Sequence, residues 1–293
     1  MQLELHLLGR PSISLDGRDL TADIGDKSLA VVAYLALETP PALAREKLAN
    51  VFWQDKTDDA ARYRLRHTLW DLRRDLGKGC IGSDDANCWL NSEGVWVDVA
   101  QFQSDFTTFV SRPMTEALAK DLTALADLYR GDFLEGILVR EAPMFEEWHL
   151  VQRERLQLLY QDVLWHTALV AQAIGDLSSA IQILNRLIRA DSLRERSYRA
   201  LMNIHSRQGD RAAALRVYEQ CSRVLASELN ARPSAETQRL RDQIAQGNDH
   251  SMQEDLERKL AQAETALVEG RPEHARSLVQ SARQVVKDLF KSA

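Results

Sequence analysis

The chain has 293 residues, of which 45% are hydrophobic and 27% are charged, and its formal net charge at pH 7 is −6. These values predict a folded protein of at least two domains and exclude a disordered chain. No apolar run approaches the ~20 residues that span a bilayer, and the first residues lack the basic segment and cleavage site of a signal peptide. We therefore expect a cytoplasmic protein that has no membrane partner.

Short alternating patterns indicate strands in the first hundred residues. Residues 2–8 and 12–15 alternate apolar and polar positions and are bounded by glycine, proline and aspartate, which predicts a small antiparallel sheet. Residues 88–90 and 95–97 form a second such pair, separated by the turn residues 91–94. We expect this second pair to form a β-hairpin.

Three helical patterns lie between these strands. Residues 27–38 are almost wholly apolar and predict a buried helix that ends before Pro40. A second helix is expected over 44–53 and, after a polar loop at 54–57, a third over 58–76. The third helix has the most distinctive surface of the three.

This third helix has an apolar stripe on one side and aromatic and basic groups on the other. The stripe has the spacing of a helix face that packs on a core, and it consists of Ala61, Leu65, Leu69, Leu72 and Leu76. The opposite face carries Tyr63, His67, Trp70 and Arg74, with Arg64 and Arg66 on its flanks. Asp58 and Asp59 supply an N-cap and first-turn acids, and Gly77 stands where a helix ends.

Residues 56–78 form a basic island in an acidic chain. They contain seven Lys and Arg residues against four Asp residues, an excess of three positive charges, whereas the whole chain carries −6. Because neutralising phosphates supplies most of the sequence-independent affinity for nucleic acid, this island predicts a helix that reads nucleic acid. The alternative is a solvated basic face on an ordinary amphipathic helix, and charge alone does not choose between the two.

The order of these elements is that of a winged helix-turn-helix with an N-terminal sheet, in which the third helix enters the major groove and the hairpin is the wing. The phrases LELHLLGRPSISLDGRDL, LAVVAYLAL, LANVFWQD and LRHTLWDLRRDLG resemble the DNA-binding half of the Streptomyces antibiotic regulatory proteins. Those proteins are activators with a winged helix of the response-regulator type followed by a bacterial transcriptional activator domain. The family motif L-R-x-x-L-x-x-L-R-x-x-L-G matches residues 65–77, and the chain departs from the family at Trp70 and Arg64, where smaller residues are usual.

The second half of the sequence is predicted to be entirely helical. Helices are expected over 99–109, 115–129 and 144–173, with an irregular stretch at 131–143 before the last. The phrases VDVAQF, LYRGDFLEG and FEEWHLVQRERL are similar to the start of the family's activator domain. The resemblance covers roughly residues 2–244.

A repeat follows the long helix. A Gly-Asp pair followed by an alanine recurs after 34 residues, at Gly175, Asp176 and Ala180 and again at Gly209, Asp210 and Ala214. This offset is the period of tetratricopeptide repeats, in which small alanines let paired helices approach closely. Leu184 and Tyr218 are expected to fill equivalent core positions, and a further helix is expected over 235–246.

Together these patterns predict a mainly α fold with a small β part. We expect a winged helix-turn-helix domain of the response-regulator type over 1–98 and an all-α, tetratricopeptide-like bacterial transcriptional activator domain over 99–247. An additional helical hairpin is expected over 248–293, with helices at 252–269 and 273–290.

Sequence motifs for catalysis are missing. The chain contains no G-x-x-x-x-G-K-[ST], no G-x-G-x-x-G after a strand, no H-E-x-x-H and no G-x-S-x-G. Three histidines lie on expected helices without paired ligands: His149, His166 and His205. The three cysteines, which have no C-x-x-C spacing, are Cys80, Cys88 and Cys221. We therefore expect free thiols, no metal, no cofactor and no enzymatic activity.

The resemblance implies a sequence-specific transcriptional activator whose partners are double-stranded DNA and RNA polymerase. It further implies binding to direct repeats as tandem protomers, which would place a homodimer on DNA. The candidate DNA contacts are Arg62, Arg64, Arg66, His67, Trp70, Arg73 and Arg74. The candidate polymerase contacts are Gln54, Asp55, Lys56 and Thr57. The alternative is a helical-repeat interaction module whose N-terminal domain docks a protein, which the acidic overall charge and the aromatic residues Tyr63 and Trp70 favour.

Overall fold

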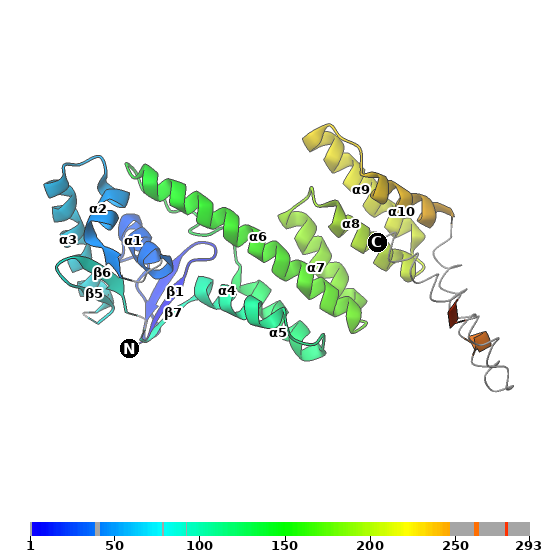
Figure 1. The fold of residues 1–293 in the computed structure, drawn as a ribbon, viewed down its shortest axis with the longest axis horizontal. Helices are drawn as coiled ribbons and strands as arrows, with labels where there is room; N and C mark the ends of the chain where they lie inside the picture. Colours follow the sequence, from blue (N-terminus) through cyan, green and yellow to red (C-terminus); the bar gives the residue numbers. More distant parts are fainter. Residues whose placement is uncertain are drawn as a thin grey trace. The chain divides into compact units, whose positions relative to one another are not determined.

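The computed structural model describes residues 2–38, 42–77, 79–91, 93–246, 261–263 and 279–280. The chain divides into two compact units, residues 1–174 and residues 175–293. Helices dominate the described part of both units, and the described strands all precede residue 98 (Figure 1). The expected mainly α fold with a small β part is confirmed. The helix pair expected over 252–269 and 273–290 lies outside the described residues, apart from the two short stretches.

The first sheet has the strand order β3-β2-β1-β7. Strand β1 (Leu3–His6) pairs antiparallel with β2 (Ser12–Leu15), and β2 pairs antiparallel with the short β3 (Arg18–Asp19). Strand β7 (Val95–Val97) joins the other edge of β1 in parallel. Because side chains alternate across a strand, one face of β1 is buried, with Leu5 fully enclosed in the core.

The second sheet has the order β4-β6-β5 and contains the wing. Strand β5 (Ile81–Ser83) and strand β6 (Asn87–Leu90) form its hairpin, and β4 (Leu43–Ala44) pairs with the outer edge of β6. The turn of the hairpin is closed by Asp84, whose Oδ1 accepts hydrogen bonds from the main-chain N–H of Ala86 at 2.8 Å and of Asn87, the first residue of β6, at 2.6 Å.

The expected hairpin between residues 88–90 and 95–97 is therefore wrong. Strand β7 leaves the wing and pairs with β1, and the N–H of Leu3 donates to the main-chain oxygen of Gly94 at 2.7 Å. The local pattern of β7 is that of a strand, but its partner lies about ninety residues earlier in the chain. Turn residues alone do not reveal such a pairing.

Three helices complete the winged helix-turn-helix of residues 2–97, which we call the head. They are α1 (Asp26–Leu37), α2 (Arg45–Trp53) and α3 (Asp58–Leu76), as the sequence predicts. Residues 29–35 of α1 are all buried, so α1 is the central helix. The N-cap of α3 is Thr57 rather than an aspartate, and its C-cap Gly77 has a φ of +90° that favours glycine.

Helices α4 (Asp98–Phe109), α5 (Glu116–Leu128) and α6 (Pro143–Ala173) belong to the same compact unit as the head. Helix α4 packs on α5, and α5 packs on α6. The segment before α6 contains no helix and no strand longer than a single bridge, which confirms the irregular stretch expected over 131–143.

Aromatic rings join the start of α6 to the head. The ring of Phe145 lies 5.0 Å from that of Phe52 in α2, and the ring of Trp148 lies 4.7 Å from that of Tyr34 in α1. The Nε1 of Trp148 also donates a hydrogen bond of 2.8 Å to Glu38. Since these rings come from three helices, the head and the first turns of α6 share one core.

The irregular segment also pairs with the end of β1. Leu8 forms an isolated antiparallel bridge with Phe133, and the N–H of Gly9 donates to the oxygen of Asp132 at 3.0 Å. Gly9 has a φ of +106°, and a Cβ at this position would lie 3.1 Å from the main-chain nitrogen of Gly131. The two backbones approach this closely only because both positions are glycine.

A buried carboxylate joins the residues that follow β1 to α4. Asp98 is 1% exposed, and its oxygens accept hydrogen bonds from the N–H of Leu7 at 2.8 and 2.9 Å and from the N–H of Leu8 at 3.0 Å. Burial raises the pKa of Asp98, and the hydrogen bonds from the two N–H groups act in the opposite direction. The guanidinium of Arg130 lies 3.7 Å from the same carboxylate.

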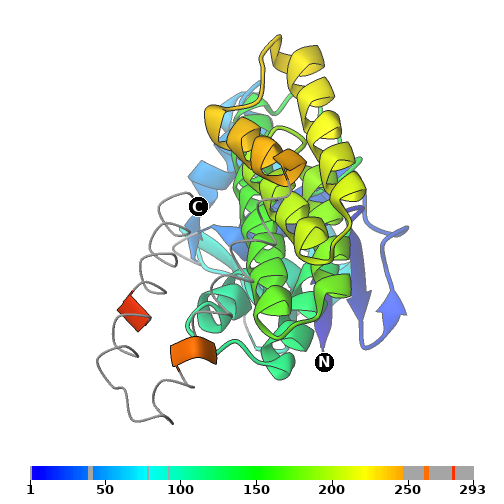
Figure 2. The same ribbon diagram turned by 90° about the vertical axis from the view of Figure 1, so that its right-hand side faces the viewer.

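The second unit consists, in its described part, of helix pairs. Its elements are α7 (Leu177–Ala190), α8 (Glu195–Arg207), α9 (Arg211–Leu229) and α10 (Ala235–Gln246). Helix α8 packs on α7 and α9, and α10 packs on both α8 and α9, as the yellow-green to orange helices of Figure 2 show. This is the expected tetratricopeptide-like arrangement.

The repeated Gly-Asp pairs are helix-start signals. Gly175 and Gly209 both have positive φ, and the aspartate that follows each accepts a hydrogen bond from a main-chain N–H in the first turn of α7 or α9, at 3.0 and 2.8 Å. Leu184 is fully buried as expected. Tyr218 is only half-buried, because it packs beneath the guanidinium of Arg241 at 5.1 Å instead of entering the core.

A polar network holds the turn before α10. The carboxylate of Glu195 accepts hydrogen bonds from the N–H of Ser234 at 3.0 Å, from its hydroxyl at 2.7 Å and from the hydroxyl of Thr237. Arg199 donates to Thr237 at 3.1 Å and pairs with Glu236 at 2.8 Å. Burial acts to raise the pKa of Glu195, but the hydrogen bonds together outweigh it, and the pKa lies below its ordinary value.

Candidate nucleic-acid interface

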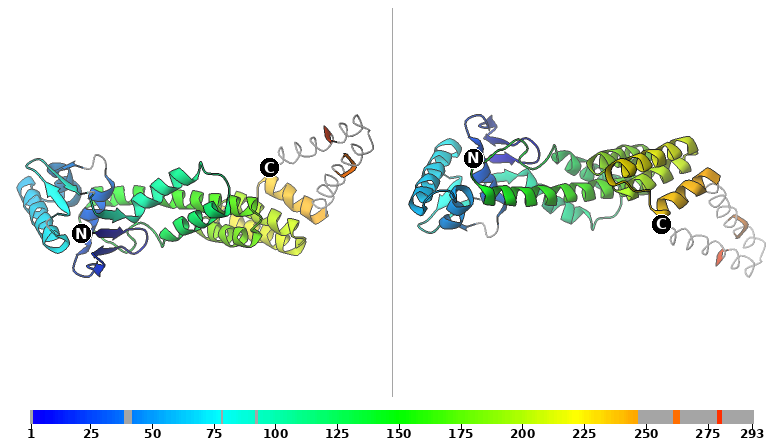
Figure 3. Two further views of the ribbon diagram at one scale, coloured as in Figure 1. Left: turned by 90° about the horizontal axis from the view of Figure 1, so that it is seen from below. Right: turned by 90° about the horizontal axis from the view of Figure 1, so that it is seen from above.

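Helix α3 lies at the surface of the first unit, with one face in the core and one in solvent (light blue in Figure 3). The five residues of the apolar stripe are each 3% exposed or less, as the periodicity predicts. On the opposite face Tyr63 and Trp70 are 63% and 59% exposed. The four-residue turn 54–57 joins α2 to α3, so the helix-turn-helix is present with its outer face open.

Two arginines in the first half of this face are available for a ligand. Arg64 and Arg66 are exposed, and neither makes a hydrogen bond or ion pair with another residue in the part of the chain that the structure describes. Arg62 differs, because its guanidinium pairs with Glu46 of α2 at 2.8 Å. The absence of a described partner makes Arg64 and Arg66 the strongest candidates for phosphate or base contacts.

The second half of the face is a cluster around Trp70. The guanidinium carbon of Arg74 lies 5.3 Å from the centre of the Trp70 ring, and the ring of His67 lies 6.2 Å from it. Both neighbours are tied to Asp71, which lies 2.8 Å from His67 Nδ1 and 3.1 Å from Arg74. Arg74 also pairs with Asp75 at 2.8 Å. The two ion pairs of Arg74 neutralise part of the positive charge that the sequence assigns to this face.

Arg73 connects α3 to the wing instead of pointing into solvent. Its Nε donates to the main-chain oxygen of Ile81 at 2.9 Å, and a terminal nitrogen donates to the hydroxyl of Ser83 at 2.6 Å. The wing itself is tightly packed, because a Cβ at Gly82 would lie 2.3 Å from the ring of Trp89. Arg73 therefore positions β5 beside α3.

The turn 54–57 is held against the irregular segment. The ammonium of Lys56 pairs with Asp55 and lies 3.6 Å from Glu141, and the hydrogen bond that Lys56 donates to Asp55 raises the pKa of Lys56. The other candidate polymerase contacts of this turn, Gln54 and Thr57, are exposed, as is Asp55.

Lys27, at the start of α1, adds a cation close to Arg64 and Lys56. Its ammonium lies 5.2 Å from the centre of the Trp53 ring. Burial is the main cause that lowers the pKa of Lys27; the charges of Asp55 and Glu141 act against it, and those of Arg64 and Lys56 act in the same direction. The sequence pattern of α3 gave no reason to include this residue.

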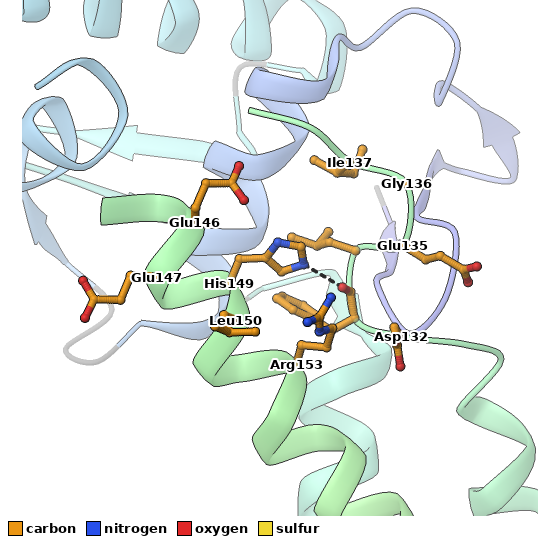
Figure 4. A pocket seen from close by; sticks show the side chains of 11 residues that line it. Asp132, Glu135, Gly136, Ile137, Glu146, Glu147, His149, Leu150 and Arg153 are labelled. Carbon is orange, nitrogen blue, oxygen red and sulfur yellow. Dashed lines mark hydrogen bonds between the residues drawn. The ribbon is translucent and has the colours of Figure 1, made fainter. Parts of the chain in front are cut away.

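A pocket of about 600 Å³ lies elsewhere in the first unit, between the irregular segment and the first turns of α6 (Figure 4). His149 crosses it, with Nε2 at 2.8 Å from the main-chain oxygen of Phe133. Four of its lining residues are carboxylates, Asp132, Glu135, Glu146 and Glu147. Because negative charge repels phosphates, these carboxylates do not favour the binding of nucleic acid at this pocket.

The described residues offer no grouping of three or more His, Cys, Asp or Glu side chains that could hold a metal ion. Among the same residues, no helix has both the length and the apolar character needed to cross a bilayer. The three cysteines are free and buried. Burial raises the pKa of each of their thiols, which keeps them protonated and unreactive.

Several residues that shape the interface were not predicted from the sequence. Glu46, Ser83 and Glu141 come from other elements, and only the fold brings them to α3 and its turn. Asp71 was detectable, since it lies four residues after His67 and three before Arg74, the spacings that place side chains side by side on a helix.

Comparison with known proteins supports this architecture. The family model of the bacterial transcriptional activator domain matches residues 97–245, just over half of the chain. The regulatory protein AfsR of Streptomyces coelicolor is 29% identical over 282 residues, which are 92% of this chain and 26% of AfsR. AfsR of Streptomyces griseus is 25% identical over 256 residues, 84% of this chain and 25% of that protein. The chain thus spans about a quarter of the length of these relatives.

A solved structure has the same fold. EmbR of Mycobacterium tuberculosis, determined in complex with a low-affinity phosphopeptide, matches with a TM-score of 0.65 at 19% identity, covering 99% of this chain and 71% of EmbR. The winged helix-turn-helix followed by a helical domain is therefore the shared architecture. The matching family is one of transcriptional regulators and not of enzymes. This chain belongs to the bacterial transcriptional activator domain family, and its relatives are regulators of the Streptomyces antibiotic regulatory protein type.

Proposed function

We propose that this chain is a sequence-specific, DNA-binding transcriptional activator that works in the cytoplasm. Helix α3 would enter the major groove with Arg64 and Arg66 toward the DNA, and the wing of β5 and β6 would lie against the adjacent backbone. The observation that carries the proposal is the outward face of α3, which is exposed and carries two arginines without a described partner. Such groups lose little on binding because no internal ion pair has to break.

Two more detailed parts of the proposal follow from the resemblance to the family. Tandem protomers would occupy direct repeats near a promoter, and the turn 54–57 would contact RNA polymerase. The turn supports this role by its position, since it lies beside the end of α3 that begins at Asp58 and three of its four residues are exposed. A polymerase subunit could reach it while α3 lies in the groove.

Binding to random duplex DNA, followed by fluorescence anisotropy at several salt concentrations, tests the proposal. A protein that neutralises several phosphates releases counterions, so the logarithm of the affinity should fall with the logarithm of salt by about 0.9 for each phosphate. We expect a slope of several units. A slope near zero would contradict DNA binding.

A second candidate function is docking of a protein by the head. The exposed rings of Tyr63 and Trp70 favour it, because aromatic residues anchor protein interfaces. The same salt titration separates the two functions, since a protein-docking head has no reason to show a steep salt dependence with random DNA.

A further inference from the structure

Trp70 is the tryptophan that the fold leaves in solvent. The chain has six tryptophans, all of them within the described residues, and the other five are buried or half-buried. Trp70 lies on the outward face of α3, opposite the stripe that packs on the core, and 59% of its surface is exposed. A large apolar ring at such a position has a substantial area to bury on a ligand.

The ring is held in place by its neighbours on the helix. Arg74 lies over it at 5.3 Å and His67 beside it at 6.2 Å, and Asp71 holds both neighbours, through an ion pair of 3.1 Å with Arg74 and a contact of 2.8 Å with His67 Nδ1. A side chain that is already ordered loses less conformational entropy when it is buried against a ligand. Trp70 is thus a pre-organised apolar contact.

The same ion pairs limit hydrogen-bond readout at this turn of α3. A guanine contact by Arg74 would require its guanidinium to leave Asp71 at 3.1 Å and Asp75 at 2.8 Å, and each separation has a cost in free energy. Arg64 and Arg66 have no such ties to a described residue. Hydrogen bonds to bases are therefore expected from Arg64 and Arg66 in the first half of the helix, and an apolar contact is expected from Trp70 in the second half.

Within the major groove, thymine presents an apolar group of its own, the 5-methyl group, whereas the other three bases present donors and acceptors. We infer that Trp70 reads thymine through this methyl group. The inference rests on the proposed function, because it assumes that α3 occupies a major groove. It adds a chemical preference, a thymine in the half of the site that faces the second half of α3.

The test removes the methyl group and nothing else. A duplex that contains the site preferred by this chain, obtained by selection from a random pool, is made with each thymine replaced in turn by deoxyuridine. Affinities are measured for the wild-type chain, for Trp70→Ala and Trp70→Phe, and for Tyr63→Ala as a matched control, since Tyr63 is an equally exposed aromatic residue on the same face. Circular dichroism checks that each variant is folded.

The wild type is expected to bind thymine about fourfold more tightly than deoxyuridine at one position, the ratio that corresponds to burial of one methyl group. Trp70→Ala should bind both duplexes equally, Trp70→Phe should keep part of the preference, and Tyr63→Ala should keep the full ratio. A wild-type ratio of one at every position, or an unchanged ratio in Trp70→Ala, would overturn the inference. Failure of the proposed function looks different, because binding to DNA would then be salt-independent and no preferred site would emerge, which would also overturn the inference.

Discussion

Arg73 and Ile81 are joined by a hydrogen bond of 2.9 Å from the guanidinium Nε in α3 to the main-chain oxygen in β5. A second bond from Arg73 to the Ser83 hydroxyl, at 2.6 Å, fixes the guanidinium against the wing. One side chain therefore sets the spacing of the two elements proposed to contact DNA. Its neighbour in sequence, Arg74, is bound to aspartates of its own helix instead.

Arg73→Met is expected to lower the free energy of unfolding by about 1–2 kcal/mol, because it removes two hydrogen bonds and leaves a main-chain acceptor of the wing without its donor. Urea denaturation measures the change. Arg66→Met is the matched control, since Arg66 is exposed and lacks a described partner, and it should stay within about 0.5 kcal/mol of the wild type. Equal effects of the two substitutions would contradict the positioning role of Arg73.

Arg66→Ala is expected to weaken binding to the preferred DNA site. A lost phosphate contact should reduce the salt slope by about 0.9, and a lost contact to guanine should cost about 1–3 kcal/mol at one base pair only. Arg62→Ala should have the smaller effect, because Arg62 is already paired with Glu46 at 2.8 Å. Unchanged affinity of Arg66→Ala at physiological salt would remove Arg66 from the interface.

Gly9→Ala is expected to destabilise the first unit more than Gly17→Ala. Both glycines have positive φ, +106° and +81°, so both substitutions strain the backbone. Only at Gly9 would the new Cβ also press on backbone, 3.1 Å from the nitrogen of Gly131, whereas nothing lies within 4 Å at Gly17. Thermal unfolding followed by circular dichroism compares the melting temperatures of the two variants. A larger decrease for Gly17→Ala would show that the close approach of Gly9 and Gly131 does not contribute to stability.

Glu195→Gln is expected to reduce the loss in the free energy of unfolding of the second unit as the pH falls below neutral. The pKa of Glu195 is lowered in the folded state, so its carboxylate contributes stability above the unfolded value of about 4.3, and that contribution is lost as pH falls through the lower folded value. At pH 7 the substitution should cost about 1.5 kcal/mol, since hydrogen bonds to a charged group become neutral ones. Urea denaturation between pH 3 and 7 measures both effects.

The control for this experiment is Glu228→Gln on the exposed side of α9. It removes the same charge from the same unit and should leave the shape of the profile unchanged. If the free energy of unfolding fell equally with decreasing pH in the wild type and in Glu195→Gln, this would contradict the role of Glu195 in holding the turn before α10.

Local patterns predicted the helices of the head well. The two faces of α3 follow directly from residue spacing, and the structure places Leu65 in the core and Trp70 in solvent as that spacing requires. Strand β7 was assigned to the wrong partner, because its parallel pairing with β1 joins segments about ninety residues apart and leaves no local trace. The close approach of Gly9 and Gly131 is equally invisible before the fold is known.

The candidate interface was predicted as a set of residues but not as a set of roles. From the sequence, six arginine and histidine side chains are equivalent candidates, and the structure separates those that have a partner among the described residues from those that have none there. Arg73 faces the wing and Arg62 faces Glu46, and both partners come from other elements. The ion pair between Arg74 and Asp71 follows from their spacing of three residues on a helix, so it could have been predicted from the sequence.

Helix α6 begins inside the core of the head, where Trp148 packs on Tyr34, and it continues for 31 residues. At 1.5 Å per residue its length is about 46 Å, which equals roughly 13 base pairs of duplex at 3.4 Å each. When the head binds an operator, the first turn of α6 lies with the head and its last turn lies about 46 Å away along the helix axis. A partner that binds the last turn of α6 could therefore be separated from the bound operator by up to this length.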